Sequence, residues 1–129
     1  MYVLVIVVCP VFAFSQDERE KVLVGAERVE LYLPKIQNRN IAIVANHTSL
    51  VGGKHLVDTL LSLKVNIKRI FCPEHGFRGN IEAGELINNH TDTKTGLPVV
   101  SLYGGNKKPK SENLQDVDVV IFDLQDVGV

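Results

Sequence analysis

Residues 65–79 read VNIKRIFCPEHGFRG, and this stretch decides how the whole chain is interpreted. Its first seven residues form a run of strand length that is rich in apolar side chains. A carboxylate, an imidazole and a guanidinium follow directly, on Glu74, His75 and Arg78. In open α/β sheets, ligand sites lie beyond the carboxyl ends of the strands. The stretch therefore predicts a buried strand that delivers three polar side chains to a site.

The rest of the sequence alternates strand-like runs with helical patterns. Further strands are predicted at residues 41–45, 99–103 and 117–122. Helices are predicted at residues 26–33, where Pro34 follows, and at residues 54–63, and a small helix is expected to open at Ser111. Apolar strands that alternate with helices indicate an α/β fold with a mostly parallel sheet covered by helices on both faces.

Right-handed crossovers would place all the strand-to-helix loops at one edge of this sheet. Polar side chains gather in those loops. Asn46 and His47 follow the first strand, Glu74, His75 and Arg78 follow the second, and Asp123, Gln125 and Asp126 follow the last. The sequence therefore predicts one polar rim, with the Glu74 carboxyl at its centre.

Each group in the loop after the second strand has a functional and a structural interpretation. Glu74 could act as a general acid or base, or it could form a salt bridge with Arg78. His75 could orient Glu74, contact a substrate, bind a metal or serve as a hydrogen-bonded structural imidazole. Arg78, between Gly76 and Gly79, suits bidentate binding of a carboxylate or phosphate, or it is an ordinary surface arginine.

The other loops are equally open to two interpretations. Asn46 and His47 could bind sugar hydroxyls or carbonyls, or they could cap the loop that follows the strand. Asp123 or Asp126 could supply the second carboxylate that cleavage of a glycosidic bond usually needs, or either could cap a following helix. Asp92 is interpreted first as a turn-forming residue.

Composition excludes several classes of protein. The chain has 129 residues, is 45% hydrophobic and carries a net charge of −1, which fits one modest globular domain and offers no basic field for nucleic acid. Its four histidines form no His-Glu-x-x-His motif, and no cysteine cluster or phosphate-binding glycine loop is present. His55 is expected on the polar side of the helix predicted at residues 54–63. We therefore predict neither a metal site nor a cofactor. Cys72 is expected to be a packed apolar residue rather than a nucleophile.

Residues 1–15 carry no charge and end in Ala13-Phe14-Ser15, a small-x-small pattern typical of a signal-peptidase site. We interpret them as a signal peptide, incomplete because no basic residue opens it. A short membrane anchor and a buried strand are the alternatives. The protein is then expected to be exported to the periplasm or the extracellular space, with no stable membrane insertion after the leader is removed. Cys9 would leave with the leader, so no intrachain disulfide is expected.

Five motifs in order resemble a bacterial family of exo-β-N-acetylmuramidases, long catalogued as a domain of unknown function. They are residues 46–48 (NHT), 73–79 (PEHGFRG), 84–85 (GE), 95–104 (TGLPVVSLYG) and 122–128 (FDLQDVG). The resemblance implies a Rossmann-like catalytic domain that a second domain follows in proteins about three times longer. Residues 16–129 would be the N-terminal part of that domain, with its C-terminal remainder missing.

The resemblance also implies roles for the polar rim. Glu74 would be the catalytic acid or base, with His75 beside it, and the substrate-binding residues would be Asn46, His47, Arg78, Asp123, Gln125 and Asp126. The substrates would be muramyl saccharides derived from peptidoglycan, whose lactyl carboxylate suits an arginine. Two alternatives remain open from the residues themselves. One is a non-catalytic sugar-binding module of the cell wall, and the other is a metal-dependent hydrolase using His75, His47 and Asp123.

Overall fold

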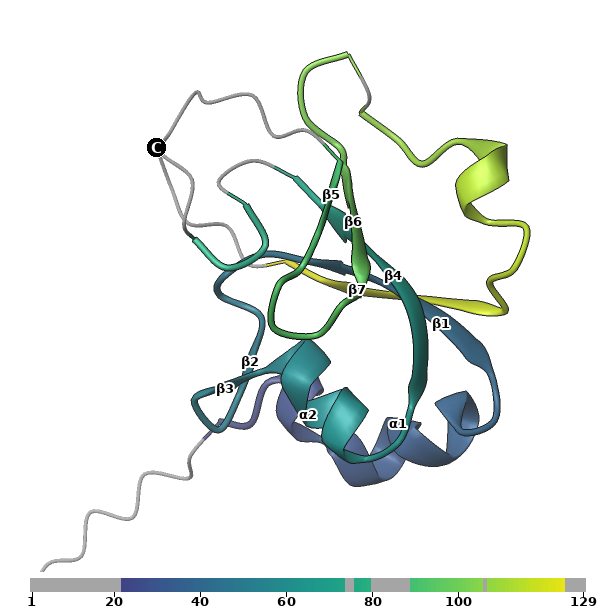
Figure 1. Cartoon of the computed structure of the whole chain (residues 1–129). Coiled ribbons are helices and arrows are strands. Elements are labelled where there is room, and N and C mark those ends of the chain that lie inside the picture. The colour runs from purple at the N-terminus through teal and green to yellow at the C-terminus, as the bar shows by residue number, and fades with distance from the viewer. Residues whose placement is uncertain (1–21, 74–75, 80–88, 106, 125–129) are drawn as a thin grey trace, which may run out of the picture.

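A five-stranded sheet forms the centre of the protein in a computed structural model, which describes residues 22–73, 76–79, 89–105 and 107–124 (Figure 1). The strand order is β5-β6-β4-β1-β7. The strands are β1 (Asn40–Ala45), β4 (Asn66–Cys72), β5 (His90–Thr91), β6 (Pro98–Ser101) and β7 (Val119–Asp123). All neighbours pair in parallel except β5, which pairs antiparallel with β6. The predicted α/β fold with a mostly parallel sheet is therefore confirmed.

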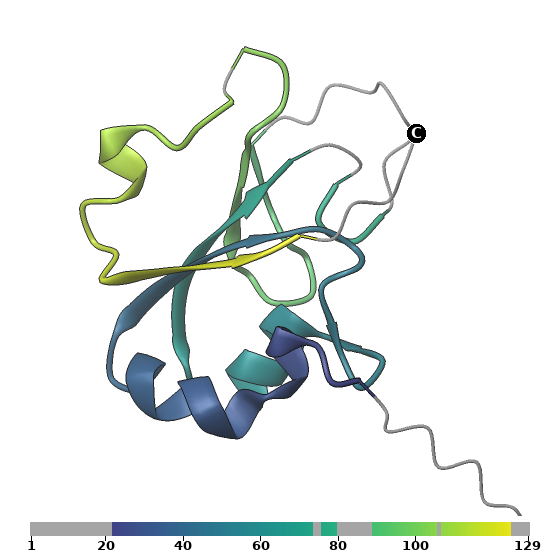
Figure 2. The same ribbon diagram turned by 180° about the vertical axis from the view of Figure 1, so that it is seen from behind.

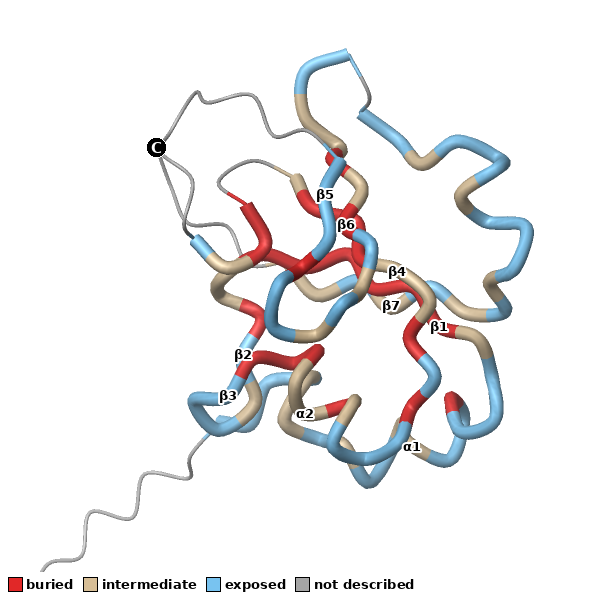
Figure 3. The backbone as a smooth tube through the Cα atoms, in the orientation of Figure 1, coloured by how far each residue is buried: buried red, intermediate tan, exposed pale blue. Residues whose placement is uncertain are grey.

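Strand β1 lies inside the sheet, between β4 and β7, and is apolar on both of its faces. Five consecutive residues, from Ile41 to Ala45, are buried, as expected of a parallel strand covered on both sides. Ile43 pairs with Ile70 of β4 on one side and with Ile121 of β7 on the other. The buried part of the chain accordingly concentrates on β1 and β4 (Figure 3).

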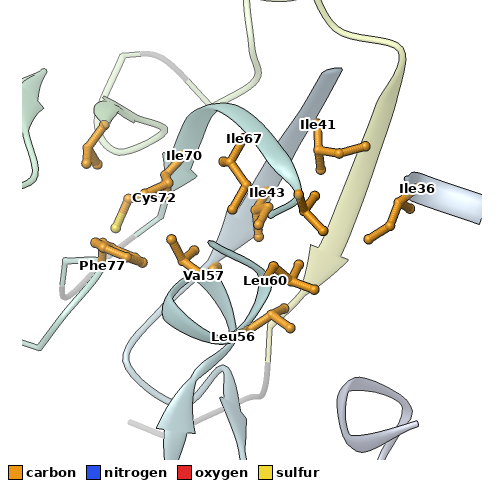
Figure 4. Packing of buried hydrophobic residues seen from close by; sticks show 13 residues of the cluster. Ile36, Ile41, Ile43, Leu56, Val57, Leu60, Ile67, Ile70, Cys72 and Phe77 are labelled. Atoms are coloured by element: carbon orange, nitrogen blue, oxygen red, sulfur yellow. The ribbon is translucent and has the colours of Figure 1, made fainter. Parts of the chain in front are cut away.

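Both α-helices of the described residues, α1 (Val29–Ile36) and α2 (Leu56–Ser62), lie on one face of the sheet (Figures 1 and 2). The prediction of helices on both faces is therefore wrong for the described residues, because no described α-helix packs on the second face. Their apolar side chains Ile36, Leu56 and Leu60 pack with Ile41 and Ile43 in the larger core cluster (Figure 4). A smaller cluster of Ala42, Val44 and Phe71 lies on the opposite face, where Val100, Leu102 and Val117 cover it. Alternate residues of β1 thus serve the two cores, as strand geometry requires.

The first helical segment differs from the prediction of residues 26–33. A short 3-10 turn, η1 (Gly25–Glu27), comes first, and Arg28 then has a non-helical backbone with ψ of 51°. Helix α1 continues through Pro34 to Ile36. Proline removes one backbone donor, but here it lies in the last turn, and the two residues after it place Ile36 in the core. Core burial therefore sets the end of the helix.

The second helical segment is shorter than the predicted residues 54–63. A hairpin of β2 (Leu50–Val51) and β3 (Lys54–His55) precedes it, and α2 starts at Leu56. Gly52 and Gly53 form the two-residue turn with φ of 56° and 83°, a conformation that glycine adopts readily. Lys54 and His55, which the helix prediction had included, therefore belong to the hairpin.

The outer strand β7 is half covered. Val120 is 47% exposed and Phe122 is 71% exposed, both on the face of the smaller core. The only helical element of the described chain between β6 and β7 is the short 3-10 turn η2 (Ser111–Asn113), which opens at Ser111 as predicted.

None of the helices in the described ranges has the length and apolar character to cross a bilayer.

Candidate functional site at the carboxyl edge of the sheet

The strand order places a topological switch point between β1 and β7. From β1 the chain moves outward through β4 to β6, and it then returns past β1 to form β7 on the other side. Open α/β sheets bind ligands at the carboxyl ends of the two strands where the order reverses. The residues at this point are Ala45, which pairs with Asp123, and Asn46, which follows it.

Hydrogen bonds join the predicted residues Asn46 and Asp123 through Ser49. The backbone N–H of Asn46 donates to Ser49 Oγ at 3.1 Å, and Ser49 Oγ donates to the carbonyl of Asp123 at 2.5 Å. Ser49 is fully buried. Asn46 and Asp123 were predicted to lie at one rim, but the local sequence around Ser49 does not indicate a partner 74 residues away.

The Asn46 side chain caps the loop after β1. Its Oδ1 accepts hydrogen bonds from the backbone N–H and the hydroxyl of Thr48, at 3.0 and 2.6 Å. This is the structural interpretation that the sequence left open. The cap holds the loop in a fixed shape at the switch point.

Asp123 is a carboxyl group in an unfavourable place for charge. Its Oδ2 is buried and has no hydrogen-bond partner among the described residues. Burial raises the pKa of the Asp123 carboxyl, because it disfavours the charged form. The residue lines a cavity of about 270 Å³ together with Tyr32, Leu56 and Phe122. Such a carboxyl keeps its proton to higher pH than a solvated aspartate, which suits a group that donates a hydrogen bond or a proton.

The loops after β1 and β4 touch each other. A Cβ atom on Gly79, at φ of 72°, would lie 3.1 Å from Cβ of His47, so both the backbone conformation and the close approach favour glycine. His47 Nδ1 is buried without a partner among the described residues. The predicted residues His47 and the Arg78–Gly79 loop are therefore brought together. Glu74, His75, Gln125 and Asp126 lie outside the described residues.

Arg78 is held by two aspartates on separate elements. Its Nε and Nη2 donate to Asp92 at 2.8 Å each, and its Nη2 and Nη1 donate to Asp58 of α2 at 3.0 and 3.2 Å. The guanidinium also lies 4.5 Å above the ring of Phe77. Four of its five N–H donors are thus directed to carboxylates of the described chain, so Arg78 is not the solvated surface arginine that was one of the two interpretations.

The hydrogen bonds from Arg78 lower the pKa of both aspartates. The hydrogen bonds from Arg78 hold the pKa of Asp92 well below its usual range, against the opposing effect of burial. Burial alone would raise the pKa of Asp58, but hydrogen bonds from Arg78 and Lys94 lower it. Asp92 also accepts from the backbone and hydroxyl of Thr95, so the predicted turn-forming role is confirmed. Both carboxylates therefore stay charged and anchor the loop that carries Arg78.

The expectation for His55 was wrong. The sequence placed it on the polar side of a helix, yet it is only 8% exposed and caps the amino end of α2. Its Nδ1 accepts from the backbone N–H of Val57 at 3.2 Å, and its Nε2 lies 2.9 Å from the carbonyl of Asn46. The hairpin before α2 turns this residue inward, and helical periodicity carries no signal for that.

Two further expectations concern metals and the thiol. The described ranges contain no group of three or more His, Cys, Asp or Glu side chains arranged to hold a metal ion. Cys72 is fully buried in the larger core, and burial raises its pKa to about 12. The prediction that Cys72 is a packed apolar residue is confirmed.

These features define a Rossmann-like α/β protein with buried polar groups at the switch point of its sheet. Residues 41–129 match the sequence profile of a family described as "Exo-beta-N-acetylmuramidase NamZ, N-terminal". The chain belongs to this family, as its motifs predicted.

Individual relatives agree with the family match. The chain is 41% identical over 102 residues to the peptidoglycan beta-N-acetylmuramidase NamZ of Bacillus subtilis, covering 75% of this chain and 24% of the relative. Crystal structures of two proteins of the DUF1343 family from Bacteroides fragilis superpose with a TM-score of 0.65 each. They are 45% and 35% identical, over 81% and 77% of this chain and 26% and 24% of theirs. The chain thus spans about a quarter of the length of these relatives.

Proposed function

We propose that the intact protein containing this chain is an exo-acting glycoside hydrolase that releases N-acetylmuramic acid from the non-reducing end of peptidoglycan fragments. The observation that carries the proposal is the 41% identity to a peptidoglycan beta-N-acetylmuramidase. The family match from residue 41 to residue 129 includes every residue of the candidate rim. The switch point between β1 and β7 supports it, because the described loop after β1 lies against the end of β7 and against Gly79 of the loop after β4.

The proposed reaction breaks the bond between the anomeric carbon of muramic acid and the glycosidic oxygen. Glu74 gives its proton to the leaving oxygen. The hydroxyl of a water molecule ends on the anomeric carbon, and the remaining proton of that water returns to the Glu74 carboxylate. Either Asp123 or the acetamido group of the substrate assists at that carbon. Asp123 is the described candidate for this role because it ends β7 beside β1, where Ser49 joins it to Asn46. His75, Gln125 and Asp126 are proposed to complete the pocket with Asn46 and His47.

Arg78 is proposed to face the lactyl carboxylate that distinguishes muramic acid from glucosamine. Asp92 and Asp58 already engage four of its N–H donors, so one donor on Nη1 is left for a ligand by the described residues. A single charge-assisted hydrogen bond is then the expected contribution, rather than a bidentate pair.

Export is part of the proposal because peptidoglycan lies outside the cytoplasmic membrane. Residues 1–15 would serve as the leader, and the protein would act in the periplasm or the extracellular space. Cleavage after Ser15 in secreted protein, read by amino-terminal sequencing, would support this; an uncleaved or cytoplasmic product would contradict it.

Two isomeric disaccharides test the activity of the intact protein. One has N-acetylmuramic acid at the non-reducing end and N-acetylglucosamine at the reducing end, and the other has the reverse order. We expect cleavage of the first alone, with free N-acetylmuramic acid identified by mass spectrometry. Binding of both without product would indicate a sugar-binding module. Loss of cleavage in a chelator, with recovery on adding a divalent metal, would indicate the metal-dependent hydrolase instead.

A further inference from the structure

His55 occupies a position from which it contacts three parts of the candidate site. It caps α2 through Nδ1, it reaches the carbonyl of Asn46 through Nε2, and its ring meets Phe77 edge-on with the ring centres 4.5 Å apart. The residue is more than nine-tenths buried. Phe77 is itself 3% exposed and directly precedes Arg78 in the loop after β4.

The two ring nitrogens of His55 have fixed and different roles. Nδ1 accepts a hydrogen bond from an N–H group, so it carries no proton, and Nε2 therefore carries the proton that it donates to Asn46. Asn46 in turn donates to Ser49, and Ser49 donates to Asp123. A continuous chain of hydrogen bonds thus runs from the amino end of α2 to the carboxyl ends of β1 and β7.

We propose that His55 is a positioning residue that sets the loop after β1 against the end of β7 at the substrate edge. Its Nε2–H holds the Asn46 carbonyl, and the same carbonyl accepts from the backbone N–H of Ser49 at 3.2 Å. Both hydrogen bonds converge on one oxygen, so His55 fixes the turn that carries Asn46 and His47. The backbone N–H of Leu56 donates to the Ser49 carbonyl at 2.8 Å and ties the start of α2 to this turn.

Two substitutions separate this role from the capping of α2. In His55→Asn, the amide oxygen can take the place of Nδ1 and keep the cap, because asparagine is a good N-cap residue, but the side chain is too short to reach Asn46. In His55→Gln, the amide nitrogen can take the place of Nε2 and keep the hydrogen bond to Asn46, but glutamine is a poor cap. Each variant therefore removes one of the two interactions.

Hydrogen exchange of the intact protein, read by mass spectrometry, tests the proposal without any substrate. We expect His55→Asn to lose protection in peptides covering residues 46–51 and to keep it in residues 56–62. His55→Gln should show the reverse. Equal changes in both segments for both variants, or no change at residues 46–51 in His55→Asn, would overturn the proposal.

Kinetics provide a second readout, which rests on the proposed function. With the muramyl disaccharide, we expect kcat/KM of His55→Asn to fall about tenfold, the loss typical of one buried hydrogen bond, while His55→Gln stays near wild type despite a lower unfolding temperature. If activity instead followed stability, His55 would have only a structural role. If the wild type cleaves neither disaccharide, the proposed function fails, and hydrogen exchange alone decides the role of His55.

Discussion

Replacing Arg78 with methionine is expected to destabilise the intact protein by about 3 kcal/mol. Methionine keeps the apolar stem that lies over Phe77 but removes the charge that Asp58 and Asp92 share. The two aspartate side chains are 8% and 6% exposed, and Arg78 is 20% exposed, so water cannot replace the guanidinium without rearrangement. Two buried carboxylates would be left facing each other.

The size of the expected loss depends on the partners that Asp58 and Asp92 retain in the methionine variant. Removing one partner of a buried ion pair costs about 3–5 kcal/mol, because the remaining charge is uncompensated. Asp58 would retain Lys94 at 2.6 Å, and Asp92 would retain the N–H and hydroxyl of Thr95. These contacts place the expected loss at the lower end of that range, since Lys94 is itself 62% exposed and its ion pair is screened by solvent.

The loss of unfolding free energy in Arg78→Met should depend on pH. Arg78 lowers the pKa of Asp92 and contributes to the lowered pKa of Asp58, so the stability that these carboxylates provide is present above the unfolded-state value of about 3.9 and is lost as the pH falls below it. In the methionine variant this contribution is absent. The difference between wild type and variant should therefore be largest near pH 7 and should shrink at pH 3–4.

Urea unfolding followed by far-ultraviolet circular dichroism measures this difference at both pH values. Lys110→Met is the matched control, because its ion pair with Glu112 is 3.9 Å long and both side chains are more than 60% exposed. The control should change the free energy of unfolding by less than about 1 kcal/mol. A loss below about 1 kcal/mol for Arg78→Met, or a loss that does not change with pH, would refute the reasoning.

Three further predictions concern neighbouring groups. Gly79→Ala should destabilise by about 1–2 kcal/mol more than Gly96→Ala, because both have φ near 72° but only the former meets His47; equal losses in urea unfolding would contradict the contact. Cys72 should resist iodoacetamide until the protein is unfolded, since burial raises its pKa to about 12; rapid native labelling, seen by mass spectrometry, would disprove this. Burial lowers the pKa of His55. Among the charged groups around its ring, Arg78 lowers this pKa further and Asp58 raises it, and Asp123 also lies close to the ring. The wild type should therefore lose stability as the pH falls below about 6.5, and His55→Asn should lose less; parallel pH curves would contradict this.

The sheet was predictable from sequence because its strands are short apolar runs. Residues 41–45 needed no information beyond their own composition, and the observed β1 differs by one residue at its start. The edge on which the loops gather followed from the handedness of parallel connections. These are properties of a few neighbouring residues or of general topology.

The contacts that organise the candidate site were not predictable in the same way. Arg78 was recognised as important, but its partners lie 14 and 20 residues away, and nothing in the local pattern indicates them. His55 looked like a polar helix residue, because the pattern does not show that a glycine hairpin turns it toward Asn46. The end of α1 depended on core packing of Ile36, which outweighed Pro34. Long-range hydrogen bonding and packing decided these details.

The central claim is that Glu74 performs proton transfer at the rim formed by the loops after β1, β4 and β7. Its most direct test is the turnover of a chromogenic β-N-acetylmuramide by the intact protein, comparing wild type with Glu74→Gln. General acid catalysis contributes about 10²–10⁴-fold, so kcat of the variant should fall at least about a hundredfold with its fold intact by circular dichroism. Undiminished turnover by the folded variant would contradict the claim.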